Sequence, residues 1–76
     1  MKKEIPFEVV EHLATLSQSG HITKELNMVS WDGVTPQADL RRWFTNETTR
    51  RPCRGLSLTQ EELEALRDAL NQLRMD

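Results

Sequence analysis

Two tryptophans and an arginine lie in the middle of this chain at spacings that favour a shared surface. Trp31 comes directly before an Asp-Gly pair, and Arg41 and Trp43 follow two residues apart from one another. Successive side chains of a strand point to opposite faces, so Arg41 and Trp43 share a face if this segment is a strand. An indole beside a guanidinium suits a flat ligand linked by negative charges. Unpaired nucleic-acid bases fit that description.

A second interpretation of the tryptophans stays open at this point. Trp is mostly buried in folded proteins, so both residues could instead seal the core of a small sheet. Under the first interpretation, the cations beside the indoles are Arg41, Arg54 and Lys24. These cations would follow the phosphates, and binding would weaken as salt rises.

The net charge argues against a nucleic-acid ligand, but the distribution of charge does not. The 76 residues carry a net charge of −2, whereas nucleic-acid-binding domains are typically basic. Residues 41–54 nevertheless hold five arginines and a single acid, Glu47, which gives this segment a charge of +4. Because local potential decides where an anion docks, the segment is a candidate footprint. Ordinary solvated loop charges are the alternative explanation.

Four strands and one helix are predicted to position these residues. Apolar and polar residues alternate, as is typical of strands, over 7–17, 22–31, 38–45 and 54–58, with turn residues between them. The alternation slips at Val9-Val10, which indicates a β-bulge or a strand covered on both faces. Leu56 and Leu58 are expected to point inward. The order predicts an α+β fold, in which the final helix covers one face of a four-stranded antiparallel sheet.

The helix has the clearest signal. Thr59 and Glu62 have the spacing of a capping box, and four leucines then recur at three- and four-residue steps. They are Leu63, Leu66, Leu70 and Leu73. A chain this short buries a small core, and its single cysteine, Cys53, excludes an internal disulfide. We therefore expect a homodimer, with the leucine stripe in the core or at the dimer interface.

No catalytic constellation is recognisable, so we do not expect an enzyme. The serines lack a neighbouring base, the three glycines are scattered, and His12 and His21 have no partner at metal-ligand spacing. We expect no cofactor, no metal and no membrane partner. The sequence has no apolar run long enough to span a bilayer and no signal peptide, which predicts a soluble, cytoplasmic protein. It should form one domain over 1–76, with a flexible N-terminus over 1–6.

Three blocks of the sequence resemble the positive-cofactor-four family of transcriptional coactivators, and most of all its bacterial YdbC-like branch. The blocks read TKELNMVSWDG at 23–33, DLRRW at 39–43 and GLSLT at 55–59, and the capped helix follows them. The resemblance covers nearly the whole chain, from Phe7 to Leu73. It implies a homodimer in which each subunit has a curved four-stranded antiparallel sheet and a C-terminal helix. It also implies binding of single-stranded DNA, with little sequence preference, through concave sheet surfaces and the loops beside them.

The resemblance also implies particular contact residues. The family's stacking aromatic at the end of the second strand falls on Trp31, and its basic strand residue falls on Arg41. The next aromatic falls on Trp43, or on Phe44 in the eukaryotic pattern. The basic positions of the second strand and before the fourth strand's glycine fall on Lys24 and Arg54.

Some positions depart from the family pattern. Val34 and Gln37 stand where relatives often carry lysine, and Arg42 replaces a usual acid. Arg42, Arg50 and Arg51 are candidates to compensate for the missing lysines. The expected nucleic-acid-binding residues are Lys24, Trp31, Arg41, Arg42, Trp43, Arg51 and Arg54.

Two other functions stay open. The acidic, leucine-striped helix or an open sheet edge could bind a partner protein. Nothing in the sequence reads a 2′-hydroxyl, so single-stranded RNA is an alternative to DNA. For single-stranded DNA, the expected process is transcription or DNA maintenance.

Overall fold

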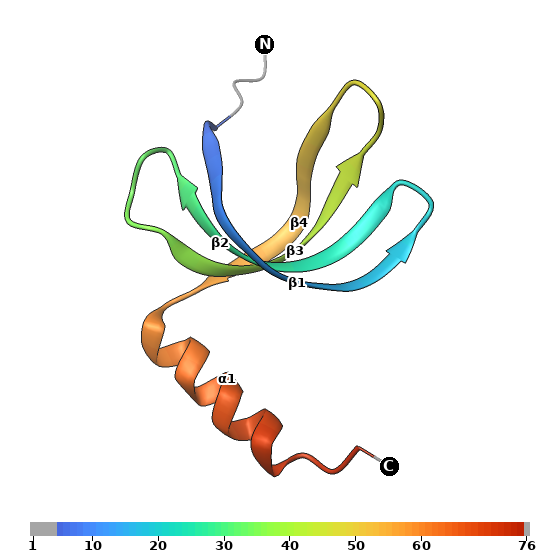
Figure 1. Ribbon diagram of the computed structural model, residues 1–76. Helices are drawn as coiled ribbons and strands as arrows, with labels where there is room; N and C mark the ends of the chain where they lie inside the picture. Colours follow the sequence, from blue (N-terminus) through green and yellow to red (C-terminus); the bar gives the residue numbers. More distant parts are fainter. Residues whose placement is uncertain (1–4, 76) are drawn as a thin grey trace.

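A computed structural model describes residues 5–75, which form one antiparallel sheet followed by a C-terminal helix (Figure 1). The strands lie side by side in sequence order, which confirms the predicted α+β class and order of elements. Their bounds are β1 Phe7–Ser19, β2 Ile22–Trp31, β3 Gln37–Thr45 and β4 Arg50–Leu58, followed by the helix α1 Gln60–Gln72.

The start of the chain bears on the expected flexible N-terminus. Residues 1–4 of that segment lie outside the described residues. The carbonyl oxygen of Pro6 accepts a hydrogen bond from the amide of Asp32 at 2.8 Å, so the chain is tied to the β2–β3 connection just before β1 begins.

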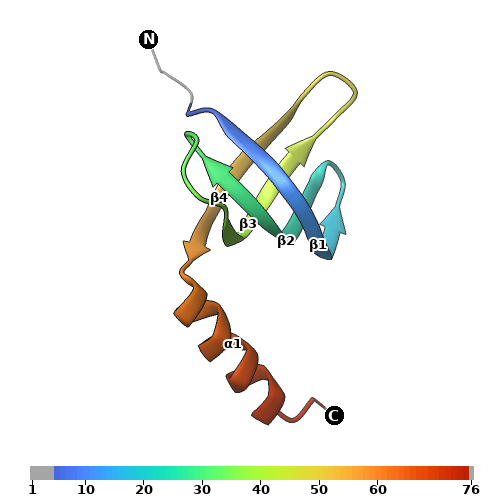
Figure 2. The same ribbon diagram turned by 60° about the vertical axis from the view of Figure 1, so that its left-hand side comes forward.

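β1 is the strand that bends the sheet. Its pairing with β2 shifts register three times, and the first shift, between Val9 and Glu11, lies where the sequence predicts a bulge. Each β-bulge bends its strand and increases the local twist. The start of β1 therefore crosses in front of the other strands (Figure 2), and the sheet is curved, with one concave and one convex side.

The curvature brings together residues that are far apart along the strands. Phe7 pairs with Trp31 at one end of β2, whereas Trp43 pairs with Thr23 near the other end. In a flat sheet these two ends of β2 would be separated by about 27 Å. The ring centroids of Phe7 and Trp43 are nevertheless 5.3 Å apart. The concave side is therefore crossed by an aromatic contact between β1 and β3.

The last two connections differ in how well the sequence predicts them. Asp32 and Gly33 have φ of 53° and 78°, as their turn signal requires. β4 was expected from Arg54 but begins at Arg50, so that prediction is wrong by four residues. Pro52 pairs with Trp43 in this added part, which is compatible with a strand at the edge of the sheet.

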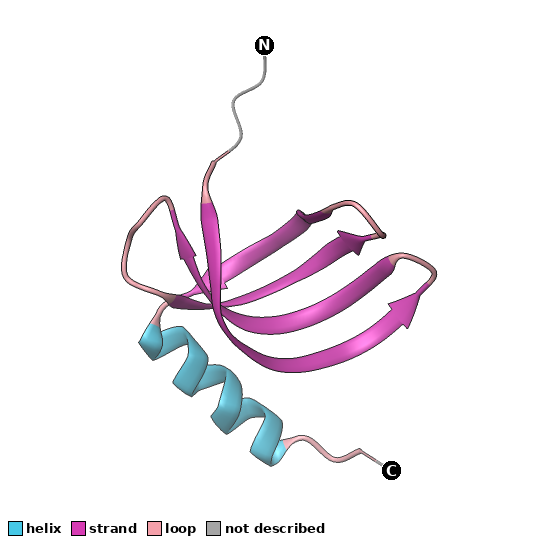
Figure 3. Ribbon diagram, turned by 45° about the horizontal axis from the view of Figure 1, so that its top comes forward, coloured by secondary structure: helices cyan, strands magenta, loops and turns pink. Residues whose placement is uncertain are grey.

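α1 begins as predicted but does not cover the sheet. The Thr59 hydroxyl accepts from the amide of Glu62 at 3.1 Å, and the Glu62 carboxylate accepts from the amide of Thr59 at 2.8 Å. The helix then slants away from the convex side (Figures 1 and 3), and none of its residues is buried. Leu70 and Leu73 remain 47% and 58% exposed. The expectation that the helix covers a sheet face is therefore wrong for the single chain.

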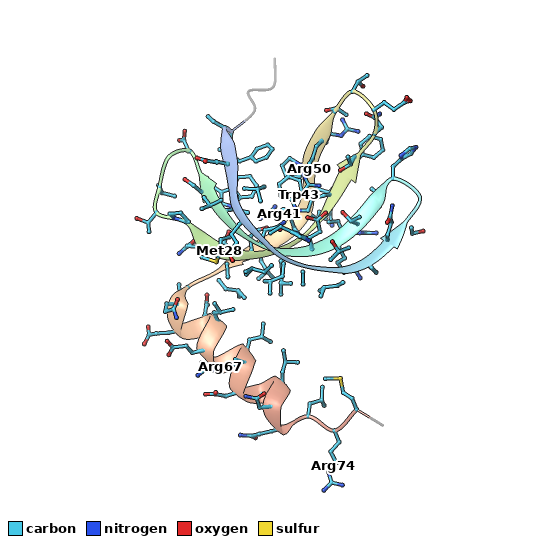
Figure 4. The ribbon with its side chains drawn as sticks, viewed as in Figure 1. Met28, Arg41, Trp43, Arg50, Arg67 and Arg74 are labelled. Carbon is cyan, nitrogen blue, oxygen red and sulfur yellow. The ribbon has the colours of Figure 1, made fainter. Side chains whose placement is uncertain are left out.

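The two faces of the sheet have different chemistry. The concave face, where Arg41, Trp43 and Arg50 lie (Figure 4), is polar and aromatic. The convex face is largely aliphatic, and Leu56, which was expected to be inward, is 54% exposed there. Within residues 5–75, the fully buried hydrophobic side chains are those of Val29, Ala38 and Trp43.

Candidate functional site

The first cluster of the concave face joins Trp31, Asp39 and Arg41, and we call it the Trp31 cluster. Arg41 donates from Nε to Asp39 Oδ1 at 2.6 Å and from Nη2 to Asp39 Oδ2 at 2.8 Å. Its Cζ lies 4.5 Å from the centroid of the Trp31 ring. Trp31 Nε1 donates to the same carboxylate at 3.2 Å. A bidentate ion pair fixes the plane of a guanidinium, so Arg41 is held in one position over the indole.

Two residues of β4 complete this arrangement. The hydroxyl of Ser57 donates to Asp39 Oδ2 at 3.0 Å, and the carbonyl oxygen of Cys53 accepts from Arg41 Nη1 at 3.1 Å. Asp39 is fully buried, and a buried carboxylate is tolerated because it is paired and hydrogen-bonded. Together these contacts leave Arg41 little freedom to turn.

Gly55 allows β4 to approach this closely. It pairs directly with Arg41, and a Cβ at this position would lie 1.9 Å from Arg41 Cβ and 2.4 Å from the Leu40 carbonyl oxygen. No side chain fits there without moving the strands apart. Glycine in a strand often marks such a close approach of two backbones.

A second cluster joins Trp43, Glu25 and Arg50, and we call it the Trp43 cluster. Arg50 donates from Nη2 to Glu25 Oε1 at 2.8 Å and from Nη1 to Glu25 Oε2 at 3.3 Å. Its Cζ lies 4.3 Å from the centroid of the Trp43 ring. Each cluster therefore consists of an indole, a guanidinium that lies over its ring, and a carboxylate that accepts two hydrogen bonds from the guanidinium.

Glu25 is held in its charged form. Burial by itself raises the pKa of this carboxyl, but hydrogen bonds from Arg50, Thr23 and Asn27, together with the charge of Arg50, lower the pKa from 4.5 to about 2. Asn27 donates to Glu25 Oε1 at 3.0 Å, and the side-chain oxygen of Asn27 lies 2.6 Å from His12 Nδ1. This chain of hydrogen bonds links β1 through β2 to β4.

A hollow of about 390 Å³ opens beside the Trp31 cluster. Its lining residues include Trp31, Arg41 and Arg51. The remaining lining residues are Ile5, Phe7, Pro52 and Cys53. Its size lies within the range of about 300–1,000 Å³ that is usual for small-ligand sites. An aromatic ring and a fixed guanidinium therefore border one open space.

The structure does not bring all of the predicted site residues to this space. Trp31, Arg41 and Arg51 line the hollow. The guanidinium of Arg51, however, lies 5.0 Å from the ring of Phe44, with which Arg51 pairs on the opposite face of the sheet. Trp43 is 0% exposed, because it lies against Phe7 and under Arg50. The expectation that Trp43 presents a ring face to a base is therefore wrong, and the core interpretation of this residue is correct.

The other three predicted cations lie on the opposite face. Lys24 and Arg42 are paired across β2 and β3 on the convex side, and with Arg54 they line a separate hollow of about 290 Å³, together with Leu16 and Leu40. None of the three makes an ion pair with another of residues 5–75. The expectation that Lys24 and Arg54 flank the indoles as part of one platform is therefore wrong.

Sequence reasoning missed four residues of the concave face. Asp39 and Glu25 were on the correct face by alternation, but their pairing with arginines was not anticipated. Arg50 carries no sequence signal for its contact with Glu25, since 25 positions separate them. Phe7 lies directly opposite Trp31 on the neighbouring strand, and it also contacts Trp43 only because the sheet curves.

Two further observations concern other kinds of site. Within residues 5–75, no group of three or more His, Cys, Asp or Glu side chains is arranged to hold a metal ion. Over the same residues, no helix has the length and apolar character needed to cross a membrane.

Comparison with known proteins identifies a relative. The chain is 37% identical over 71 residues to an uncharacterized protein of Treponema pallidum (strain Nichols), and the match covers 92% of this chain and 81% of that protein. The chain therefore belongs to the same family as that Treponema protein. No family model matches the chain.

Proposed function

We propose that this protein binds single-stranded DNA, without catalysing a reaction, through the hollow beside the Trp31 cluster. The observation that carries the proposal is the stacked pair of Trp31 and Arg41, locked by Asp39 at the edge of an open hollow. A base stacked on such a surface contributes about 1–3 kcal/mol, with little dependence on its identity. A duplex hides its base faces, so single strands are the preferred ligand. The curved sheet and the sequence blocks also support membership of the positive-cofactor-four family.

Arg41 and Arg51 have different roles in this proposal, because only Arg41 is paired with a carboxylate. Asp39 neutralises Arg41, so Arg41 serves mainly as a flat surface and a hydrogen-bond donor. Arg51 makes no ion pair within residues 5–75. Its guanidinium lies over Phe44 on the opposite face, so it contacts phosphate where the DNA strand leaves the hollow around the edge strand β4. With few free cations on the concave face, the salt dependence of binding is modest, since each contacted phosphate adds only about 0.7 to the slope for single strands.

We also propose that the protein is a homodimer that buries the convex face and α1. Large apolar side chains remain exposed on the single chain, and a small domain with so few buried side chains gains from association. The free cations Lys24, Arg42 and Arg54 border this face, and α1 carries an excess of acids. These opposite charges suit contact between two copies. The exposed apolar residues are Val10, Leu13, Leu16, Leu56, Leu70 and Leu73.

Titration of a fluorescent oligothymidine and of a matched duplex at low salt tests the proposed ligand. We expect the single strand to bind more tightly, and Trp31→Ala to weaken its binding. Equal binding to both, or no binding to either, contradicts the proposal. The same titration with oligouridine distinguishes RNA from DNA, which share the exposed base faces that the hollow would recognise.

A second candidate function is favoured by the exposed leucine stripe of α1. If a different protein covers α1, the chain is a protein-interaction module. In a pull-down, retention of a partner after nuclease treatment and in a Trp31→Ala variant supports this function over the first.

A further inference from the structure

Arg50 occupies an unexpected position on the concave face. Its guanidinium lies over the ring of Trp43 at 4.3 Å and is gripped by both oxygens of Glu25. A further hydrogen bond joins its Nη1 to the hydroxyl of Thr45 at 3.1 Å. Although one side rests on the indole, 37% of the side chain remains exposed. Its guanidinium is therefore fixed by three hydrogen bonds on a side chain that is still partly open to solvent.

The Trp43 cluster repeats the construction of the Trp31 cluster. In both, an arginine lies within about 5 Å of an indole and makes a two-point contact with a buried carboxylate. Phe7 touches both indoles, with centroid separations of 5.7 Å to Trp31 and 5.3 Å to Trp43. The two clusters therefore both contact the ring of Phe7, on the concave face of the sheet.

We infer that Arg50 is a second stacking site, at which an unpaired base lies flat against the face of the guanidinium that points away from Trp43. This inference rests on the proposed function, and it places a second base at Arg50, which the sequence offered only as a replacement for missing lysines. Arginine planes stack on bases as aromatic rings do. Because Glu25 neutralises Arg50, this site contributes base stacking to the binding energy rather than attraction for phosphate.

The inference also gives buried Trp43 a role. Its ring does not contact the ligand but supports the guanidinium that does. Its Nε1 has no hydrogen-bond partner within residues 5–75, and a buried unpartnered donor is normally avoided. The position is occupied by an indole even though the N–H is unused, which is consistent with a requirement for a broad flat surface under Arg50.

The test compares Arg50→Lys with the wild-type protein, using fluorescent oligothymidine and an oligonucleotide of the same length without bases. Lysine keeps the charge beside Glu25 but loses the plane. We expect Arg50→Lys to weaken oligothymidine binding roughly 5- to 150-fold, the equivalent of one stacked base. On the abasic strand the two proteins should bind alike, and the salt slope should not change. Arg67→Lys, on the exposed surface of α1, is the matched control and should bind as the wild type does.

Three outcomes overturn the inference. Wild-type affinity of Arg50→Lys for oligothymidine means that the plane is not used. An equal loss on the abasic strand, or a smaller salt slope, means that Arg50 contacts phosphate instead. Failure of the wild-type protein to bind any single strand removes the proposed function as well, so the two failures are distinguishable.

A second variant guards against misfolding. If thermal unfolding shows that Arg50→Lys is not folded, the double variant Glu25→Gln, Arg50→Met removes both charges without leaving a buried carboxylate unpaired. It should show the same loss on oligothymidine and no loss on the abasic strand. Binding of the folded double variant at wild-type strength contradicts the inference.

Discussion

Gly55→Ala should damage stability and binding together, because Gly55 lies directly opposite Arg41. The added Cβ would lie 1.9 Å from Arg41 Cβ, 2.4 Å from the Leu40 carbonyl oxygen and 2.5 Å from Arg41 Cα. These atoms belong to the β3 backbone or its first side-chain carbon, so no flexible side chain can yield. Overpacking of this kind costs about 1–3 kcal/mol. At about 4–8 °C per kcal/mol for a domain of this size, the melting temperature should fall by about 4–24 °C.

The movement of β3 away from β4 should also break the hydrogen bond from Arg41 to the Cys53 carbonyl oxygen and that from Ser57 to Asp39, which help to hold Arg41 over Trp31. We therefore expect Gly55→Ala to weaken oligothymidine binding at a temperature where circular dichroism shows the variant folded. Gly20→Ala is the matched control: Gly20 has φ of 60° with open space around its Cβ position, so alanine costs about 1–2 kcal/mol of backbone strain without touching the site. A stable Gly55→Ala with unchanged binding would refute this reasoning about the close approach of the two strands.

Further predictions separate the roles of individual residues. Trp31→Ala should weaken oligothymidine binding by about 1–3 kcal/mol and should destabilise the fold less than Trp43→Ala, which should cost about 3–5 kcal/mol of stability; the reverse order in melting curves contradicts the assignment. Because the folded pKa of Glu25 lies below its ordinary 4.5, its contribution is complete above that pH and is lost as pH falls toward about 2. Between pH 4.5 and about 2, the free energy of unfolding of Glu25→Gln should therefore fall by up to about 3 kcal/mol less than that of the wild-type protein. Identical pH profiles of the two proteins would argue against the ion pair. Leu70→Asp should convert the proposed homodimer to a monomer in light scattering, and a dimer that survives this change is not held by the leucine stripe.

Local patterns predict the individual elements well. The bounds of β2 follow from its alternation, the first bulge of β1 follows from the slip at Val9, and the start of α1 follows from the Thr59 capping box. Where α1 packs is not encoded in the same way. A leucine stripe specifies that one helix face must be covered, but it does not specify whether the cover is the same chain or another.

The candidate site was only partly predictable for a related reason. Period-two alternation correctly grouped Arg41 with Trp43, but the burial of Trp43 depends on Phe7 and Arg50, which reach it through the curvature of the sheet. Alternation also put Lys24 on the opposite face. Cations that lie near the tryptophans along the sequence therefore need not lie near them in the fold. Long-range pairs such as Glu25 with Arg50 leave no periodic signal in a single sequence.

The central claim is that the concave face, at the Trp31 cluster, binds unpaired bases. Its most direct test is a titration of isotope-labelled protein with oligothymidine, followed by the two indole N–H signals and the backbone amides in nuclear magnetic resonance spectra. We predict the largest shifts at the Trp31 indole, Arg41 and Arg51. Shifts confined to Lys24, Arg42 and Arg54 on the convex face, or no shifts at all, would contradict the claim.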